Sequence, residues 1–531
     1  MIPSVVTAAP GVYVLPPIDN NFSLATDLSV TAATAVVMRR GEVGKPFTVT
    51  RANWQDKCGK PLPMSHGAEA EGMRHVKDAL EGCDRVTLVR VIASDAKYPV
   101  IQLKPATGGG EPAGKKAQKK AQADKDMDVV TEALPYGNDV KLADGAILAV
   151  WPKDGDPSDN RRVVISNVDA DKGRFSILFQ EKISGEFVNI PNESFVAGLG
   201  EDDKDDENRT VYLPALLEER GSRFRAAVAL NASVSSLDKV EGEFAGGTNG
   251  GKPKADDFKK AWSMLGAPQL DIDLMFAAGQ YDANVIADYL HIASGKLAQF
   301  RYDIPPALTE KAAIEWIRDA QINNYLCQGY HYPYRANDEW FGGKSIWGVS
   351  GTATAGKGRC LTAPTGRVDV RGAHFTNAGD NRGVVGRRGV EPLHYTDQVE
   401  PAELAAARIN PVNNGAVIGD CLTTWNAENY LRFEHVGAVL NDISHEFVKA
   451  ARIVKFEPDG LTEGALLDMC RDICDARVQS GALVTPRNPE DGDEPYQIMI
   501  EQVELDLWQV TIAVCVTGVG RRIAMQPILI K

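Results

Sequence analysis

The most informative stretch of this 531-residue chain is "DIDLMFAAGQYDANVIADYLHIASGKLAQFRYDIPP", residues 271–306. Its first apolar run predicts a buried strand, and "DANVIADYLHIASGKL" then shows apolar residues at helical spacing behind Asp282, a residue type that caps helix N-termini. "QFRYDIP" predicts the next strand. Strand, helix and strand in this order form an α/β unit.

The α/β pattern continues on both sides of this stretch. "LTEKAAIEWIRDA" (308–320) predicts a helix capped by Thr309. Upstream, a helical stretch precedes "RVTLVRVIA" (85–93), whose nearly continuous apolar run is typical of a strand buried on both faces. We therefore expect a middle α/β domain made of residues 21–103 and 211–370.

Residues 104–210 interrupt this domain. The segment 104–128 combines glycines, a proline and a lysine run, which predicts an exposed linker, and the acidic segment "GEDDKDDEN" (200–208) closes the insertion. Between them, apolar and polar residues alternate in short bursts separated by turn residues. This pattern predicts an inserted all-β module between two flexible hinges.

The last third, residues 371–519, mixes helices and strands in another order. Helical spacing runs through 426–454 and 462–483, and "YQIMIEQVELDLWQVTIAVCVTGVG" (496–520) predicts two strands broken near Glu504 to Asp506. We expect an α+β domain here, in an α+β multidomain chain with mixed α/β core domains.

Both ends of the chain carry a short apolar run with no local strand partner. We interpret residues 1–20 and 520–531 as extended arms, because an unpaired apolar strand is an aggregation hazard unless it joins another subunit's sheet. A subunit that both donates and accepts strands polymerises, since the contact is heterologous. The expected arm residues are Val12, Tyr13, Val14, Ile528, Leu529 and Ile530.

Composition argues against several classes of protein. The formal charge of −14 disfavours direct nucleic-acid binding, which needs clustered Lys and Arg, and no segment is apolar enough to insert into a membrane. The N-terminus lacks the basic start of a secretory signal, so we expect folding in a cytoplasm. Eight scattered cysteines predict reduced, mostly buried thiols, and Cys470 and Cys474 lack the partners that a metal site requires.

Catalysis finds no support among the motifs. "GGEPAGKK" (109–116) and "GTATAGKG" (351–358) match the core of a phosphate-binding loop, but both lack the following Ser or Thr. We interpret them as Gly-rich loops with incidental lysines. Neither a nucleophile elbow nor a zinc-protease helix is present. The chain is therefore expected not to be an enzyme and to need no cofactor or metal, with a nucleotide-binding α/β enzyme carrying a degenerate loop as the alternative from another class.

Several segments in a fixed order resemble the sheath protein family of contractile (myovirus-type) bacteriophage tails. The resemblance begins with "PGVYV" (10–14) and residues 271–306. It continues through "ARINPVNNGAVIGDCLTTW" (407–425) and "LRFEHVGAVLNDISHEFVKAARIVKFEP" (431–458) to the final strands, and covers about residues 1–102 and 215–531.

This resemblance implies a structural subunit that forms stacked hexameric rings around a tail tube and contracts to drive the tube through the host envelope. The arms would link neighbouring subunits, and the inserted module would face outward. Implied partners are the subunit itself, the tail tube protein, and the baseplate and tail terminator proteins, in a virion tail assembled in the host cytoplasm. The alternative within this class is the sheath of a phage-tail-like bacteriocin or injection machine.

The resemblance also implies that residues 371–519 form the inner domain, so one of its helices should touch the tube. The favoured helix is "LTEGALLDMCRDICDARVQSGAL" (461–483). Leu466, Leu467, Cys470 and Cys474 share the face expected to pack on the domain's own core. The candidate tube-facing residues are Glu463, Asp468, Arg471, Asp472 and Arg477.

Overall fold

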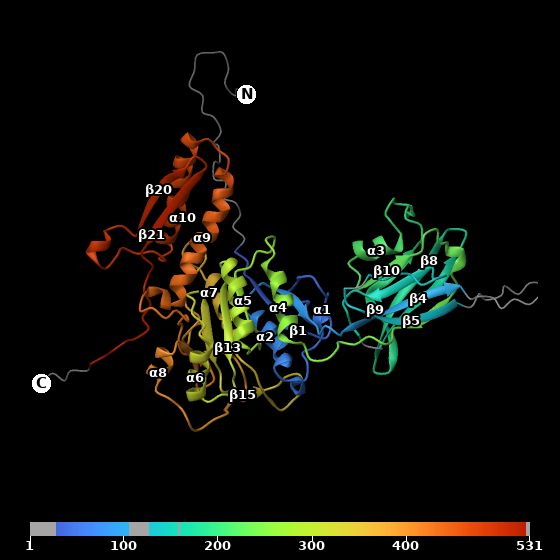
Figure 1. Cartoon of the computed structure of the whole chain (residues 1–531), viewed down its shortest axis with the longest axis horizontal. Helices are drawn as coiled ribbons and strands as arrows, with labels where there is room; N and C mark the ends of the chain where they lie inside the picture. Colours follow the sequence, from blue (N-terminus) through green and yellow to red (C-terminus); the bar gives the residue numbers. More distant parts are fainter. Residues whose placement is uncertain (1–27, 106–126, 138, 158–159, 527–531) are drawn as a thin grey trace, which may run out of the picture.

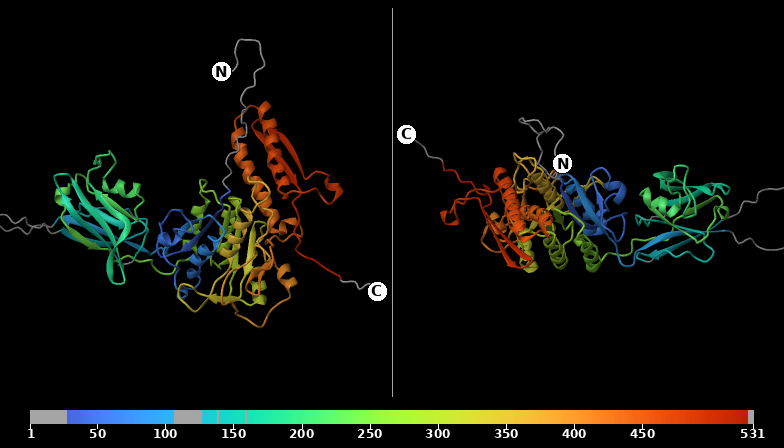
Figure 2. Two further views of the ribbon diagram at one scale, coloured as in Figure 1. Left: turned by 180° about the vertical axis from the view of Figure 1, so that it is seen from behind. Right: turned by 90° about the horizontal axis from the view of Figure 1, so that it is seen from above.

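The computed structural model describes residues 28–105, 127–137, 139–157 and 160–526. Figure 1 shows a central α/β body with a β module on one side and, on the other, a projecting pair of long helices with a β-hairpin beside them. The views in Figure 2 keep the three parts distinct. In the described part of the chain, no helix is both long and apolar enough to cross a membrane.

An eight-stranded sheet forms the centre of the body, in the order β19-β18-β14-β13-β12-β1-β3-β2. Its strands run parallel except β2 and β19 at the two edges, which are antiparallel to their neighbours. The strands are β1 (Thr31–Val37), β2 (Phe47–Val49), β3 (Arg85–Val91), β12 (Leu274–Phe276), β13 (Gln299–Ile304), β14 (Cys327–His331), β18 (Ile409–Asn413) and β19 (Val417–Ile418).

Helices cover both faces of this sheet, as its uninterrupted apolar strands predict. Along β1, Ala32 and Val36 join one apolar core, while Ala33 and Ala35 join the core on the opposite face. The doubly buried strand expected at 85–93 is confirmed as β3. The helices are α1 (Trp54–Cys58), α2 (Gly72–Ala79), α4 (Ala255–Ser263), α5 (Ala283–Gly295), α6 (Glu310–Ala320), α7 (Ser350–Leu361) and α8 (Pro401–Ala406). A small sheet at one end comprises β15 (Tyr334–Asn337), β16 (Lys344–Ile346) and β17 (Glu391–Pro392).

Both helix caps predicted from the sequence are confirmed. The Asp282 side chain accepts a hydrogen bond from the Asn284 amide at the start of α5, and the Thr309 hydroxyl accepts one from the Ala312 amide at the start of α6. Each cap satisfies a backbone donor that the first turn of a helix leaves unpaired. The predicted strand–helix–strand unit of residues 271–306 is therefore present as β12, α5 and β13.

The inserted module is a sandwich of two antiparallel four-stranded sheets, β10-β6-β4-β5 and β11-β7-β8-β9. The aromatic rings of Phe179 and Phe224 stack between the sheets with centroids 3.8 Å apart. One further helix, α3 (Leu213–Glu219), packs beside β10. The strands are β4 (Lys97–Pro105), β5 (Met127–Pro135), β6 (Leu148–Pro152), β7 (Arg161–Asp169), β8 (Arg174–Ile183), β9 (Glu186–Ala197), β10 (Phe224–Val228) and β11 (Val240–Glu243).

The module is larger than the predicted insertion, and the predicted hinges lie inside it. Strands β4, β10 and β11 lie wholly or mostly outside 104–210 yet belong to its two sheets, so these bounds are corrected. The segment 104–128 joins the paired strands β4 and β5, and 200–208 lies between β9 and α3. The chain enters and leaves the module side by side, because Lys97 and Thr248 exchange two backbone hydrogen bonds of 2.8 Å.

The C-terminal part projects from the body as two long helices and a hairpin (Figure 1). The predicted helices and the strand break near Glu504 to Asp506 are confirmed. The predicted domain boundary between residues 370 and 371 is wrong, because β18 and β19, which follow it, belong to the central sheet of the body. The elements are α9 (Glu434–Val454), α10 (Asp459–Gln479), β20 (Tyr496–Glu504) and β21 (Leu507–Val514).

Candidate subunit interfaces

The β20–β21 hairpin is a two-stranded sheet with two open outer edges. Among the residues that the structure describes, β20 and β21 pair only with each other. The alternate side chains Tyr496, Ile498 and Ile500 are half-buried, and the Tyr496 hydroxyl donates to Asp475 of α10 at 2.6 Å. One face of the hairpin is thus held on a helix while both edges keep unpaired backbone groups, as an acceptor of further strands requires.

Large apolar side chains are exposed on β20 and at the turn end of this hairpin. The exposed fractions are 54% for Met499, 52% for Val503, 88% for Leu505 and 48% for Leu507. Gathered exposure of this kind marks surfaces that another molecule covers. The two strands are predictable from the sequence, and "VELDL" (503–507) places three apolar residues around a tight turn, although their exposure was not predicted.

The chain after the hairpin is anchored before it leaves the body. The Thr517 amide donates to the Ala482 carbonyl at 3.0 Å, and Arg521 Nε donates to the Asp420 carboxylate at 2.7 Å. The hydrogen bond to Asp420 raises the pKa of Arg521, so this ion pair is formed at any physiological pH. Beyond the anchor, Ile523 and Met525 are exposed to 90% and 82%.

The six arm residues named from the sequence lie outside the described residues. Val12, Tyr13 and Val14 belong to residues 1–27, and Ile528, Leu529 and Ile530 belong to residues 527–531. Their pairing remains a prediction. Within residues 520–526, which the structure describes, Arg521 is held to the body by Asp420, a contact that the sequence does not predict.

The predicted outer face of α10 is only partly present. Leu466, Cys470 and Cys474 are buried and Leu467 is half-buried, as the helical spacing predicts. Asp468 and Arg471 are exposed and lie 4.0 Å apart as a loose ion pair, and Glu463 and Asp472 are exposed as well.

Arg477 does not share this outer face, and its assignment there is wrong. Arg477 is 5% exposed, and its guanidinium donates to one carboxylate oxygen of Asp442 in α9 from Nε, at 2.9 Å, and from a terminal nitrogen, at 2.6 Å. The spacing of residues along α10 does not reveal that Asp442 of α9 lies next to Arg477. The charge of Arg477 alone suggested a place on the surface. This largely buried ion pair joins the two long helices.

The segment "GTATAGKG" (351–358) is a buried helix and not a Gly-rich loop. It forms most of α7, whose small residues allow close packing on α2: a Cβ on Gly351 would lie 2.2 Å from the carbonyl oxygen of His75 in α2. Lys357 is fully buried and lies 2.8 Å from Glu434. This removes the phosphate-binding alternative for 351–358, because neither a loop nor an accessible lysine exists there. The other match, 109–116, lies outside the described residues.

A buried polar cluster holds the N-terminal end of α7. Asp303 at the end of β13 accepts hydrogen bonds from the Val349 amide at 2.6 Å and the Ser350 amide at 2.9 Å. Nearby, His75 Nδ1 accepts from the Gly351 amide at 3.2 Å and lies 3.3 Å from the Ser350 hydroxyl oxygen. Ser350, His75 and Asp303 are at most 1% exposed, so this cluster of nucleophile, base and acid types is closed to solvent and fixes the start of a helix.

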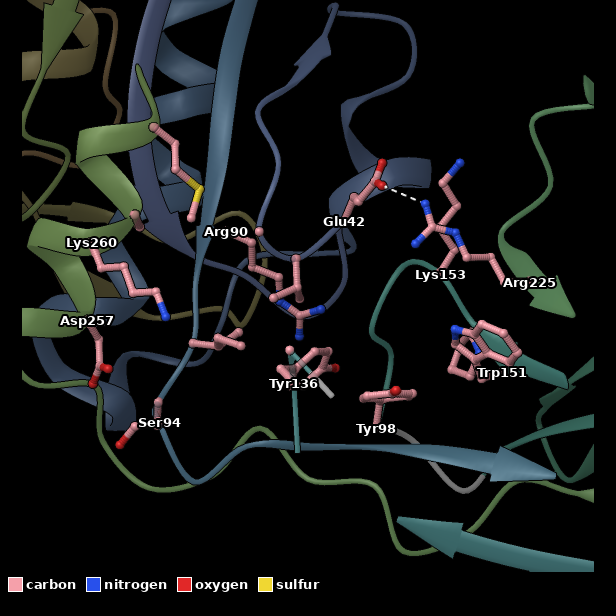
Figure 3. Close-up of a pocket in the computed structure, with 18 of the residues that line it drawn as sticks. Glu42, Arg90, Ser94, Tyr98, Tyr136, Trp151, Lys153, Arg225, Asp257 and Lys260 are labelled. Carbon is pink, nitrogen blue, oxygen red and sulfur yellow. Dashed lines mark hydrogen bonds and ion pairs between the residues drawn. The ribbon is translucent and has the colours of Figure 1, made fainter. Parts of the chain in front are cut away.

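A cavity of about 460 Å³ lies where the module meets the body (Figure 3). Arg90 of β3 spans this junction, donating to the carbonyls of Asp154 and Gly155 at 2.9 Å. The cavity's other charges include the Glu42–Arg225 ion pair at 3.3 Å, drawn dashed in Figure 3, and its walls include Tyr98, Tyr136 and Trp151. The polar groups of the cavity walls link the body to the module. They do not point toward a common position, as the groups of a ligand-binding site would.

The cysteines fit the prediction of reduced, mostly buried thiols. All eight are unpaired and seven are buried. Burial raises the pKa of Cys474 to about 11, which keeps this thiol protonated and unreactive. Within the described residues, no group of His, Cys, Asp and Glu side chains has the arrangement of a metal site.

No protein-family model and no curated protein matches this chain. Solved structures do match. A sheath tail protein of Listeria innocua has a TM-score of 0.51 and 11% sequence identity over 92% of this chain and 96% of that one. At this identity the likeness shows the fold alone.

Two further structures have TM-scores below 0.5 and do not contribute to the assignment. A sheath tail protein of Desulfitobacterium hafniense has a TM-score of 0.48 and 14% identity over 95% of this chain and 100% of that one. A PVC sheath complex of an extracellular contractile injection system has a TM-score of 0.40 and 17% identity over 52% of this chain and 74% of that one. The similarity to the Listeria structure shows that this chain has the fold of a sheath tail protein. This confirms the fold that the resemblance in its sequence implied.

Proposed function

We propose that the chain is the structural subunit of a contractile tail sheath, polymerising as stacked hexameric rings around a tail tube and contracting to drive the tube through a host envelope. The β20–β21 hairpin carries this proposal, because it offers two open edges on a chain whose ends have the composition of strands. The Val12–Val14 and Ile528–Ile530 segments of neighbouring subunits are the strands it would accept.

Such a subunit works without catalysis. The energy for contraction is held in the packing between subunits of a metastable extended sheath and is released when they repack. The burial of Lys357 and of the Ser350–His75–Asp303 cluster supports a structural role. The partners would be further copies of the chain, the tail tube protein, and the baseplate and tail terminator proteins, in a tail assembled in the bacterial cytoplasm. The same subunit would serve a phage-tail-like bacteriocin or injection machine, which lacks a capsid.

The exposed side of α10 is our candidate for the tube contact. Contacts with the tube must break as the sheath widens, which favours screened polar pairs over an apolar patch. Asp468, Arg471 and Asp472 fulfil this condition, and Glu463 lies on the same helix.

Co-sedimentation with isolated tail tubes tests this function. The wild-type chain should pellet with tubes, and reversing the charges of Asp468, Arg471 and Asp472 together should reduce the bound fraction, more strongly at low salt, with the melting temperature unchanged. Failure of the wild type to bind tubes contradicts the sheath function. Unchanged binding by the triple variant removes α10 from the tube contact and leaves α9 as the next candidate.

A further inference from the structure

Helix α9 projects from the body with an exposed apolar residue on the face that begins at the body. Asp442, Glu446 and Lys449 of α9 follow one another at helical spacing and line a small pocket together with Arg371 of the body. Ile453 continues this row, because the eleven residues from Asp442 make about three helical turns. Its side chain is 68% exposed. The row that starts at the body thus ends in an uncovered apolar side chain.

Phe456, just after the end of α9, is a second uncovered apolar residue. It is 92% exposed and has φ +78°, a left-handed conformation that is unusual for an aromatic residue. A glycine would adopt this backbone more easily, so the position keeps a large apolar side chain at a cost in free energy. Leu461, near the start of α10, is exposed to 62%. The free end of the two long helices therefore carries apolar surface of the kind that another segment covers.

The described chain begins at the foot of this row. The Ser29 carbonyl accepts a hydrogen bond from Arg371 at 3.0 Å, and the Val30 amide donates to Asp84 at 2.7 Å. Because Arg371 and Asp442 line the same pocket, Ser29 lies close to the point where α9 leaves the body. The segment directly before Leu28 therefore starts within reach of the uncovered face.

The length and the pattern of residues 21–27 match this face. An extended chain covers about 17 Å from Ser29 back to Leu24, and α9 also rises about 17 Å from Asp442 to Ile453. Phe22 follows at about 24 Å, near the level of Phe456. In an extended chain, alternate residues such as Phe22 and Leu24 share one side. The stretch "NNFSLAT" (20–26) has no charged side chain that contact with an apolar surface would desolvate.

We propose that residues 21–27 lie extended along α9 of their own chain, with Leu24 against Ile453 and Phe22 against Phe456. The short connection to Ser29 gives the segment an effective concentration in the millimolar range, so a second copy competes poorly for the same face. Residues 1–20 then leave the subunit at the free end of α9 and not at the body. This inference concerns a single subunit and does not depend on the proposed sheath function.

A disulfide between the segment and α9 tests the docking. In a Cys515→Ser background, Leu24→Cys is combined with Ile453→Cys. The matched control combines Leu24→Cys with Val448→Cys, since Val448 is exposed on another face of α9. Non-reducing gels and peptide mass spectrometry measure the intramolecular bond after mild oxidation of dilute protein. Because the two Cα atoms must lie within about 7 Å, we expect a yield at least about fivefold above that of the control and unchanged on dilution.

Three results of this experiment would overturn the proposal. Equal yields from the two cysteine pairs would mean that the segment moves freely around α9. Linked dimers whose yield falls on dilution would assign the face to the segment of a second copy. The absence of a bond with either pair would place the segment elsewhere. None of these results affects the sheath function, because the assay uses subunits that have not polymerised.

Two truncations give an independent measurement. Removing residues 1–20 leaves the segment in place, whereas removing residues 1–27 uncovers the face and keeps β1. The fluorescence of a dye that binds apolar surface should match the wild type after the first truncation and rise about twofold after the second. Phe22→Ser with Leu24→Ser should raise it similarly in the full chain, and Ile453→Ser should reverse part of the rise in the longer truncation. Equal fluorescence from the two truncations would overturn the proposal.

Discussion

The Lys357 ammonium lies 2.8 Å from the Glu434 carboxylate, and neither side chain reaches solvent. The same carboxylate oxygen lies 3.3 Å from Arg301 of β13. Glu434 is the first residue of α9, so this buried network joins the projecting C-terminal helices to α7 and to the central sheet. The network is a buried joint between α9 and the body, and the proposed sheath function needs such a joint to be rigid.

Glu434→Gln should therefore destabilise the protein strongly. The substitution keeps the shape but leaves Lys357 and Arg301 buried without a counter-charge, and losing one partner of a buried ion pair costs about 3–5 kcal/mol. Urea unfolding measures the loss. Glu446→Gln is the matched control, because Glu446 pairs with Lys449 on the surface at 3.1 Å and should change stability by less than about 1 kcal/mol. Equal small effects from both variants would contradict the buried joint.

Stability should fall as the pH drops below 7, with His331 contributing. Burial lowers the pKa of His331 from 6.5 to about 4, so the unfolded chain takes up a proton at a higher pH than the folded chain does. The folded state then loses roughly 2 kcal/mol from this group between pH 7 and pH 5. Comparing urea midpoints at the two pH values should show a smaller loss for His331→Gln than for the wild type. An identical pH dependence would mean that His331 is not buried in its neutral form.

Helix caps and apolar patterns in the sequence predicted many helices and strands of the body. The wrong predictions concern residues whose position depends on contacts with distant parts of the chain. The caps Asp282 and Thr309 were predictable because a cap acts within three residues. The helix α7 was not, since glycine and threonine have low helix propensity and its stability comes from packing on α2. Arg477 was misplaced because its partner Asp442 lies on another helix. The module's bounds were too narrow because β4 and β10 carry the same apolar pattern as strands of the body.

Excising the module at its structural neck should leave a functional subunit. Lys97 and Thr248 are hydrogen-bonded neighbours, so residues 98–247 can be replaced by a short Gly/Ser bridge without moving the flanking chain. We expect a folded protein that polymerises as the wild type does, measured by circular dichroism and pelleting. A folded product that fails to polymerise would place the module in the contacts between subunits.

The narrower excision of residues 104–210 is the informative comparison. It removes β5 to β9 but leaves β4 and β10, exposing apolar residues such as Leu103 and Phe224 that are now fully buried. This variant should aggregate on expression. A soluble, polymerising product would show that the bounds predicted from the sequence were adequate.

Deleting residues 1–20 should separate folding from polymerisation. The deleted segment contains Val12, Tyr13 and Val14, which have no strand partner nearby in the sequence and should pair only with another subunit. The truncated protein should keep the wild-type melting temperature and sediment as small species at concentrations where the full chain pellets. If the truncated protein formed sheaths of normal length, residues 1–20 would not be an arm that polymerisation requires.

Negative-stain electron microscopy of the purified full-length chain tests the central claim most directly. A sheath subunit whose hairpin accepts strands from its neighbours should form rings or tubes of one uniform diameter as its concentration is raised, with no added nucleotide. Compact monomers at every concentration, accompanied by nucleotide turnover in the same preparation, would contradict the account.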